Sequence, residues 1–514
     1  MIRRIAALIL LCSPLLVAAQ KKDKNAIKAA ATITVEDMKK HLYIIAGKEM
    51  EGRNTPSPGL DKAAAYIESQ FKAFGLAPGN NGSYLQQYPL YRDSTLGATL
   101  KINGTAFELN KDFQPQAGNY AAEMRFSEIV FAGYGISDGD LRNDYKDLNV
   151  TGKLVLIVDD MPADYKPSRT GFGSPAGTSG RIAAAAAKGA TGLLIVNNSF
   201  PRNASSVPST WSLNDGFRAA QNPFTFTVSA NTAGKILGEE GKNIFEKMKS
   251  GLITYKNYPA EIELAYSKSS KTTYASNVVG VLEGTDRKDE YVIITAHYDH
   301  LGKRDSIIYY GADDDGSGTT GVLEMAEAFA KAKQNGNGPR RTMIFMTVSG
   351  EEKGLWGSNY YTNHPLFPLE KTTVDLNIDM IGRTDSSRHY GDSANYVYVV
   401  GDDKLSTDLK PISEAANKEY LNVELDYKYN DPNDRNRIYF RSDHYNFARK
   451  GIPIIFYYDG MLKADYHKPT DTPDKINYPL MVKRAQLIFY TAWEIANRDE
   501  MLKRDIKLET PRGF

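Results

Sequence analysis

The chain has 514 residues, of which 63 are basic and 62 acidic, so its formal net charge is +1. This length exceeds one usual hydrophobic core, and at roughly 150 residues per domain it predicts two or three units. The balanced charge provides no basic surface of the kind that binds nucleic acid or anionic membranes, so nucleic acid is excluded as a partner.

Residues 1–19 are typical of a secretory signal peptide. Arg3 and Arg4 form the charged start, residues 5–17 form an apolar stretch, and small residues precede Gln20. The apolar stretch is too short to span a bilayer well, so we expect an exported protein, periplasmic or extracellular, without a stable membrane anchor. An uncleaved anchor is the alternative. Removal of this segment also removes Cys12, the only cysteine, which excludes disulfides.

The segment that follows predicts a leader and two helices. Residues 20–33 are rich in Lys and Ala, and we expect them to be frayed. Thr34 is a suitable cap for a helix that continues to Ile45. A second helix is predicted after Pro58, where apolar residues recur at helical spacing until Gly75.

Residues 121–269 have a different texture, with short strand candidates separated by loops rich in Gly, Ser and Pro. The strand candidates are residues 129–131, 154–158 and 193–196, and an Ala-rich helix is predicted at 181–188. We therefore predict a small β-rich domain inserted into a larger domain, which comprises residues 20–120 and 270–514.

After Asn277, continuous apolar runs alternate with helical patterns. The runs are residues 278–282, 292–295, 343–348, 397–400 and 452–457, and the helical patterns are 319–332, 405–418 and 478–496. A further strand candidate, residues 374–378, ends next to Asp379. Strands without polar alternation are buried on both faces, so this part predicts an α/β fold.

Five polar segments lie near the ends of these runs. They are His297-Tyr-Asp299-His300, Asp313-Asp314-Asp315, Glu351-Glu352, Asn-Ile-Asp379-Met and Asp465-Tyr466-His467. Ligand groups in open α/β sheets gather at the carboxyl ends of strands, so we expect a single site. Two imidazoles and three carboxylates suit two divalent cations with a position left open for water.

Each segment alone has an ordinary structural explanation, such as a surface His-Asp pair or an acidic helix start. Three successive acids repel one another, however, and a cation explains them better. Asp379 in an apolar run needs a metal or a buried ion pair. Glu351 and Glu352 point different ways, which suits one ligand and one general base. We interpret the other histidines as structural: His41, His300, His364, His389 and His444.

As a set, the five segments resemble the ligand motifs of the co-catalytic dizinc exopeptidases. These include leucyl-type aminopeptidases, glutamate carboxypeptidase and, as an inactive relative, the transferrin receptor. The resemblance implies that Asp314 bridges two zinc ions, that His297 and Asp379 complete one site, and that Glu352 and His467 complete the other. It also implies a three-layer, phosphorylase/hydrolase-like zinc exopeptidase core with a central mixed, mostly parallel sheet.

The same resemblance implies further roles in catalysis. Glu351 would be the general base, Asp299 the acid behind the first histidine, Tyr466 the residue that stabilises the oxyanion, and Arg441 a substrate-binding residue. The inserted domain resembles a protease-associated domain through residues 147–157 and 188–195.

The implied function is that of an exported dizinc aminopeptidase, which uses a metal-bound hydroxide to remove N-terminal residues from peptides. A carboxypeptidase or dipeptidase of the same fold is an alternative, because the metal ligands do not determine which peptide end is held. A binding or receptor protein without catalysis is an alternative of a different class, and it is disfavoured because no ligand is missing. Oligomeric state and side-chain preference stay open.

Overall fold

The computed structural model describes residues 22–116, 118–170, 174–198, 200, 210–213, 222–252, 254–431 and 434–508, so the predicted signal peptide lies outside the described residues. The chain divides into two compact units. The first contains the chain up to Gln86 together with Asn277–Lys507, and the second contains Gln87–Ser276. Among the described residues, no helix is long and apolar enough to cross a membrane.

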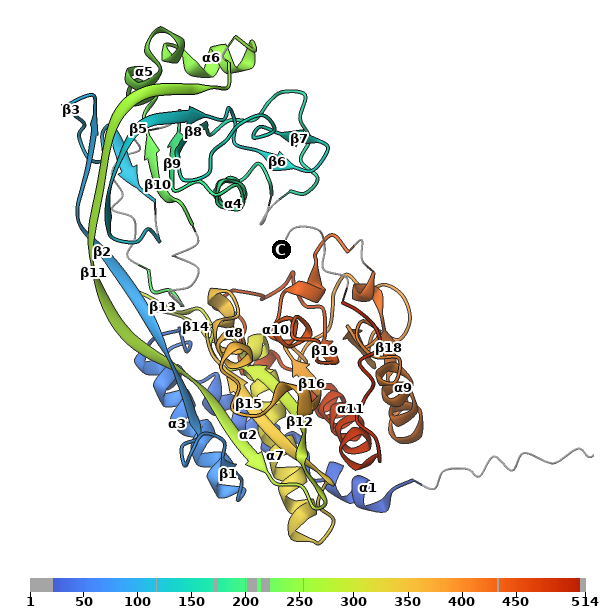
Figure 1. The fold of residues 1–514 in the computed structure, drawn as a ribbon. Coiled ribbons are helices and arrows are strands. Elements are labelled where there is room, and N and C mark those ends of the chain that lie inside the picture. The colour runs from blue at the N-terminus through green and yellow to red at the C-terminus, as the bar shows by residue number, and fades with distance from the viewer. Residues whose placement is uncertain are drawn as a thin grey trace, which may run out of the picture. The chain divides into compact units, whose positions relative to one another are not determined.

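The first unit is built on a mixed, mostly parallel sheet (Figure 1). The strand order is β18 (Glu424–Asp426), β17 (Tyr396–Val400), β19 (Ile454–Tyr458), β16 (Thr372–Ile378), β12 (Arg287–His297), β15 (Arg341–Val348) and the end of β11 (Asn257–Leu282). Only the pairs β17–β19 and β11–β15 are antiparallel. Every residue of β15 and β16 is buried, so both faces of these strands are covered. The predicted α/β fold is confirmed.

Helices cover this sheet. The pair α7 (Gly318–Gln334) and α11 (Tyr478–Asn497) packs against β12 and β15, and α10 (His444–Ala448) packs against β16 and β19. The ring of Phe329 lies 4.6 Å from that of Phe489, which joins α7 to α11. The other helices of this unit are α2 (Val35–Ile45), α3 (Pro58–Ala73), α8 (Trp356–Asn363) and α9 (Leu409–Tyr420), and its short strands are β1 (Ala77–Pro78), β13 (Gly302–Arg304) and β14 (Ile307–Tyr309).

The N-terminal segment differs from the prediction of a frayed leader. Residues from Lys24 to Ala30 form α1, which packs against α7 and α11 and buries three alanines. The carboxylate of Asp23 caps this helix by accepting from the backbone N–H of Asn25 at 2.7 Å, and it also accepts from Nε1 of Trp493 at 2.9 Å. Small side chains on one face allow close packing, which the Lys/Ala composition alone does not reveal. The prediction of α2 with its Thr34 cap is correct.

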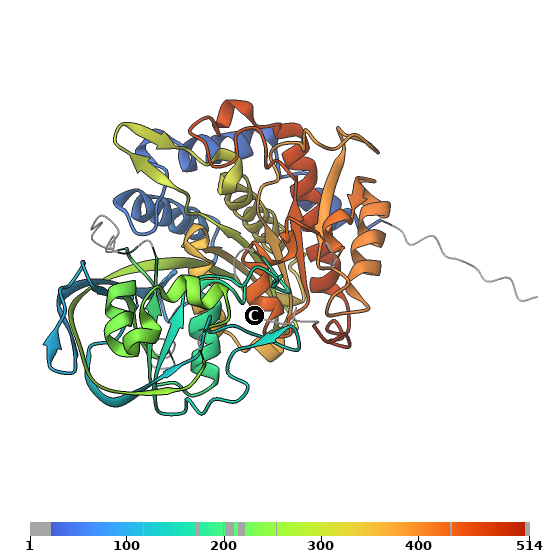
Figure 2. The same ribbon diagram turned by 90° about the horizontal axis from the view of Figure 1, so that it is seen from above.

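The second unit has its own core, and most of its strands belong to the same long sheet, which passes from one unit to the other through β11. The strand order is the first part of β11, then β5 (Ala122–Phe131), β8 (Leu154–Val158), β9 (Gly192–Val196), β10 (Phe224–Val228) and β4 (Phe113–Pro115). Its helices are α4 (Thr178–Ala187), α5 (Ala230–Leu237) and α6 (Ile244–Lys249), and α5 and α6 are the green helices that pack together in Figure 2. Its remaining strands are β2 (Leu85–Ile102), β3 (Thr105–Ala106), β6 (Ser137–Asp138) and β7 (Arg142–Asn143).

This second unit includes more residues than the predicted insert of residues 121–269. It begins at Gln87 because most of the long strand β2 belongs to it, and Leu100 and Ile102 of that strand lie in its core with Phe131 and Phe226. The description of this unit as a protease-associated domain stays a prediction.

Candidate metal centre and active site

The predicted ligands lie at the carboxyl ends of neighbouring strands. His297 is the last residue of β12, Asp379 directly follows β16, and Glu352 follows β15. These three strands are parallel neighbours, so their carboxyl ends meet at one edge of the sheet. The turn before α7 adds Asp314, and the loop after β19 adds His467. Residues separated by as many as 170 positions in sequence therefore meet in one cluster.

Asp314 lies between the two histidines. Its Oδ1 is 3.3 Å from Nε2 of His297, and its Oδ2 is 3.2 Å from Nε2 of His467. Oδ1 of Asp379 lies 3.5 Å from the same nitrogen of His297, and Oε2 of Glu352 lies 3.2 Å from that of His467. The five side chains thus form two groups that share one carboxylate.

The distances and chemistry of this cluster fit metal ions. Bonds of about 2.0–2.2 Å to a tetrahedral zinc ion place neighbouring ligand atoms about 3.3 Å apart, close to the separations of 3.2–3.5 Å found here. Nε2 of His297 and Oδ2 of Asp314 are buried without a hydrogen-bond partner among the described residues. Buried polar atoms rarely lack partners, so both atoms fit the role of cation ligands.

The acids on either side of Asp314 have other partners. The two oxygens of Asp315 accept backbone N–H groups from His297, Gly318 and Met380 at 2.8–3.2 Å. Asp315 also lies within reach of a cation near His297 and Asp379, but these amides already occupy its oxygens. Oδ1 of Asp313 accepts the backbone N–H of Gly382 at 2.8 Å. The expectation that a cation explains all three acids is therefore too broad, because backbone amides hold two of them and leave Asp314 free.

Asp299 supports the cluster in a way that the sequence does not reveal. Its carboxylate oxygen lies 3.8 Å from Nδ1 of His297, whereas its backbone carbonyl oxygen lies 3.1 Å from that nitrogen. The carboxylate instead accepts the backbone N–H of Glu351 at 3.1 Å. Residue 299 therefore orients His297 through its main chain and the Glu351 loop through its side chain.

The two adjacent glutamates have opposite electrostatic surroundings. Burial raises the pKa of Glu351 well above its ordinary value, and the carboxylates of Glu352 and Asp379 add to this effect although His297 opposes it. Burial would also raise the pKa of Glu352, but contacts with His300 and His467 bring it down to about 2. Glu351 is thus suited to hold a proton and Glu352 to carry a negative charge.

A pocket opens next to the cluster. It is lined by Asp314, Glu351, Asp379, Met380, Ile438, Arg441, Phe456, Tyr458, Leu462 and Tyr466. The guanidinium of Arg441 donates a hydrogen bond to the hydroxyl of Tyr466 at 3.1 Å, and the ring of Tyr466 stacks on His467. Every catalytic and substrate-binding residue expected from the sequence except Asp299 lies on this pocket.

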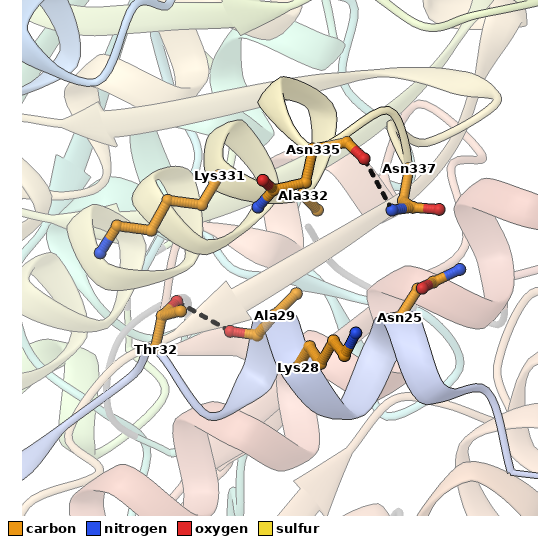
Figure 3. A pocket seen from close by; sticks show the side chains of 8 residues that line it. All are labelled: Asn25, Lys28, Ala29, Thr32, Lys331, Ala332, Asn335 and Asn337. Carbon is orange, nitrogen blue, oxygen red and sulfur yellow. Dashed lines mark hydrogen bonds between the residues drawn. The ribbon is translucent and has the colours of Figure 1, made fainter.

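A larger cavity of about 320 Å³ lies elsewhere in the first unit, between α1 and the end of α7 (Figure 3). Its lining consists of Asn25, Lys28, Ala29, Thr32, Lys331, Ala332, Asn335 and Asn337. This lining offers neither a carboxylate nor an imidazole, so it lacks a general base and metal ligands. The smaller pocket at the strand ends is therefore the candidate active site.

Two residues near the site were not assigned to it from the sequence. His300, interpreted as structural, lies against the cluster, with Nδ1 2.8 Å from Oε1 of Glu352. Its place in sequence next to His297 and Asp299 could have indicated a role in the site. We assigned the metal-binding role in this segment to His297 alone. The second residue is Arg53, which the sequence linked to no role in the site.

Arg53 is completely buried and joins distant parts of the first unit. Its guanidinium donates hydrogen bonds of 2.7–2.9 Å to the backbone carbonyls of Ile45, Tyr298, Tyr310 and Gly311. Tyr298 and Gly311 belong to the loops that carry the proposed ligands. This side chain thus holds those loops in place and is not itself one of the proposed ligands.

Residues 277–492 match peptidase family M28. This match, over fewer than half of the residues, makes that part of the chain similar to the family. Among relatives, a probable leucine aminopeptidase of Arthroderma otae is 29% identical over 216 residues, which are 41% of this chain and 55% of that protein. A probable glutamate carboxypeptidase of Zea mays is 26% identical and covers 65% of this chain and 48% of its own length. The chain spans about half the length of these two relatives.

Among solved structures, an aminopeptidase from Aneurinibacillus sp. strain AM-1 has a similar fold. The TM-score is 0.52 at 20% sequence identity, and the match covers 94% of this chain and 99% of that one. The predicted resemblance to metallo-exopeptidases is confirmed over residues 277–492. The roles of individual residues in this part of the chain stay predictions.

Proposed function

We propose that the protein is an exported aminopeptidase that holds two zinc ions and acts on peptides. The observation that carries the proposal is the position of Asp314, whose two oxygens face two different histidines at 3.3 and 3.2 Å. In this proposal, His297 and Asp379 would hold one ion, Glu352 and His467 would hold the other, and Asp314 would serve both. Such ions would supply the usual chemistry of this kind of site, which is to acidify water and polarise the scissile carbonyl.

Glu351 acts as the proton shuttle in this mechanism. Its raised pKa allows it to accept a proton from the attacking water and then to donate that proton to the leaving amine. Tyr466 lies on the same pocket and donates its hydroxyl proton to the oxyanion that forms when water attacks the carbonyl. Asp299 keeps Glu351 in place through the backbone hydrogen bond of 3.1 Å.

The pocket lining supports an apolar N-terminal residue as substrate. The carboxylates of Glu351 and Asp379 are suited to receive a free α-amine. Beyond them the walls are the side chains of Met380, Ile438 and Leu462, together with aromatic rings. A charged substrate side chain packed against these apolar walls would lose hydration without gaining a partner from them, whereas an aliphatic one gains from burial.

A carboxypeptidase is the second candidate, and Arg441 is the observation that favours it. This arginine lies on the pocket, where a guanidinium can form two parallel hydrogen bonds with a terminal carboxylate. The hydrogen bond from Arg441 to Tyr466 supports the first candidate instead, because it commits part of the guanidinium to the catalytic phenol.

One substrate series distinguishes the two candidates. We expect the zinc-loaded protein to hydrolyse leucyl and phenylalanyl p-nitroanilides at least about 10-fold faster than the lysyl or glutamyl analogues. The same anilides with an acetylated α-amine should be poor substrates. Hydrolysis of N-acetylated dipeptides with a free carboxylate, at rates above those of the free-amine anilides, would favour the carboxypeptidase.

A further inference from the structure

His300 is a buried imidazole that lies against the proposed second zinc site. Its side chain is fully buried, and its backbone N–H donates to the carbonyl of Arg53 at 3.2 Å. The ring lies edge-on to that of His467, with centroids 5.9 Å apart. A Cβ atom on Gly311 would come within 2.4 Å of Cγ of His300, so the imidazole fills the space above this glycine. The ring therefore has one well-defined position.

The two oxygens of Glu352 face two different imidazoles. Oε2 lies 3.2 Å from Nε2 of His467, and Oε1 lies 2.8 Å from Nδ1 of His300. Neither Oε1 nor Nδ1 has an aligned hydrogen-bond partner among the described residues. Each atom is thus available to the other.

The two separations have different meanings. Two ligands of one tetrahedral zinc ion lie about 3.3 Å apart, which agrees with 3.2 Å for Glu352 and His467. At 2.8 Å, Glu352 and His300 are too close to share an ion in this way. A hydrogen bond from an imidazole N–H to a carboxylate has a length of about 2.7–2.9 Å, which is the separation of these two atoms. Nδ1 of His300 also lies 3.8 Å from Oδ2 of Asp314, whereas Nε2 of His467 lies 3.2 Å from the same oxygen.

We propose that His300 is a positioning residue, which donates its Nδ1 proton to Oε1 of Glu352 and leaves Oε2 as the only oxygen offered to the second zinc ion. The inference rests on the proposed two-zinc site. Without this donor, Glu352 loses its fixed orientation and can offer both oxygens, which occupies a coordination position that substrate or water needs. Partners behind metal ligands typically change metal affinity by about 10–100-fold.

Two substitutions test the role of His300. In His300→Asn the amide nitrogen takes the place of Nδ1 and keeps a donor, whereas His300→Leu removes the donor and retains an apolar filling. The zinc affinity of each site is measured by competition with a chromophoric chelator, and the zinc content by elemental analysis. His41→Leu serves as the matched control, because His41 is another buried histidine of the same unit.

We expect His300→Leu to weaken the second site about 10–100-fold while the first site keeps its affinity. We expect His300→Asn and the His41 control to bind both ions as the wild type does. Unchanged affinities in His300→Leu would overturn the inference. Equal losses in Asn and Leu variants would also overturn it, because His300 would then be a ligand itself. If His300→Leu does not fold, His300→Asn still decides between donor and ligand. A wild-type protein that binds fewer than two ions would refute the proposed function instead.

Discussion

Arg441 donates a hydrogen bond of 3.1 Å to the hydroxyl of Tyr466. The phenol oxygen accepts this bond, so its own proton stays available for an oxyanion in the pocket. We expect Tyr466→Phe to lower kcat about 10²–10³-fold with little change in zinc content, the usual effect of removing one oxyanion donor. Steady-state kinetics on leucyl p-nitroanilide measure this loss.

The same contact predicts the combined effect on kcat of substituting Arg441 and Tyr466 together. If Arg441 acts on kcat through Tyr466, the double variant Arg441→Met/Tyr466→Phe should have nearly the same kcat as Tyr466→Phe alone. Independent, multiplying losses in kcat would show that Arg441 contributes to turnover by another route, such as a contact with the substrate.

The adjacent glutamates offer a matched pair of isosteric changes. Glu351→Gln should keep both zinc ions and lose about 10²–10⁴-fold in kcat, because it removes the proton shuttle. Glu352→Gln should lose the second ion, because it removes a charged ligand. Zinc analysis alongside kinetics separates the two effects. The opposite pattern would mean that ligand and base are assigned the wrong way round.

Asp314→Asn should weaken both zinc sites together, because one carboxylate serves both proposed ions. Asp375→Asn is the control. This second aspartate is buried on β16, and burial raises its pKa well above the ordinary value, so the substitution changes little charge. Chelator titration should show two weakened sites in the first variant and none in the second. Loss of a single ion from Asp314→Asn would assign the bridging role to another residue.

Much of the fold follows from features that are local in sequence. Residues 154–158 are apolar at every position and residues 343–348 at all but one, which is enough to predict buried strands, and the polar residues after the second of these predict part of the site. Two elements have no such signal. Helix α1 depends on buried alanines and on contacts with α7 and α11, and the hydrogen bond from Trp493 to its cap residue Asp23 spans 470 residues. The role of His300 depends on how close Glu352 comes in three dimensions.

A buried acid far from the proposed site makes stability depend on pH. Glu324 is buried in α7 with Oε1 3.5 Å from Nε2 of His41, and burial, with Asp37 and Glu327 nearby, raises its pKa to about 8. Between its unfolded value of about 4.5 and 8, the folded protein binds more protons than the unfolded chain. The free energy of unfolding therefore falls as pH rises through this window.

Glu324→Gln removes that dependence. We expect its Tm to exceed the wild-type value by more at pH 8.5 than at pH 4.5, where the wild-type carboxyl is protonated in the folded state and half protonated in the unfolded chain. The pKa of His41, which burial lowers to about 4, changes stability in the opposite direction but equally in both proteins. Glu370→Gln, at an exposed position of the same unit, should show no such trend. A constant difference in Tm across this range would contradict the raised pKa of Glu324.

The hydrogen bonds of Arg53 also set an order of events during synthesis. Its partners Tyr298 and Gly311 follow it by 245 and 258 residues, and at about 5–20 residues per second they emerge roughly 10–50 s later. All of Gln87–Ser276 is made in that interval, so this part of the second unit exists before the loops that carry the proposed ligands. A site that depends on these carbonyls therefore cannot form until more than half of the chain has been made.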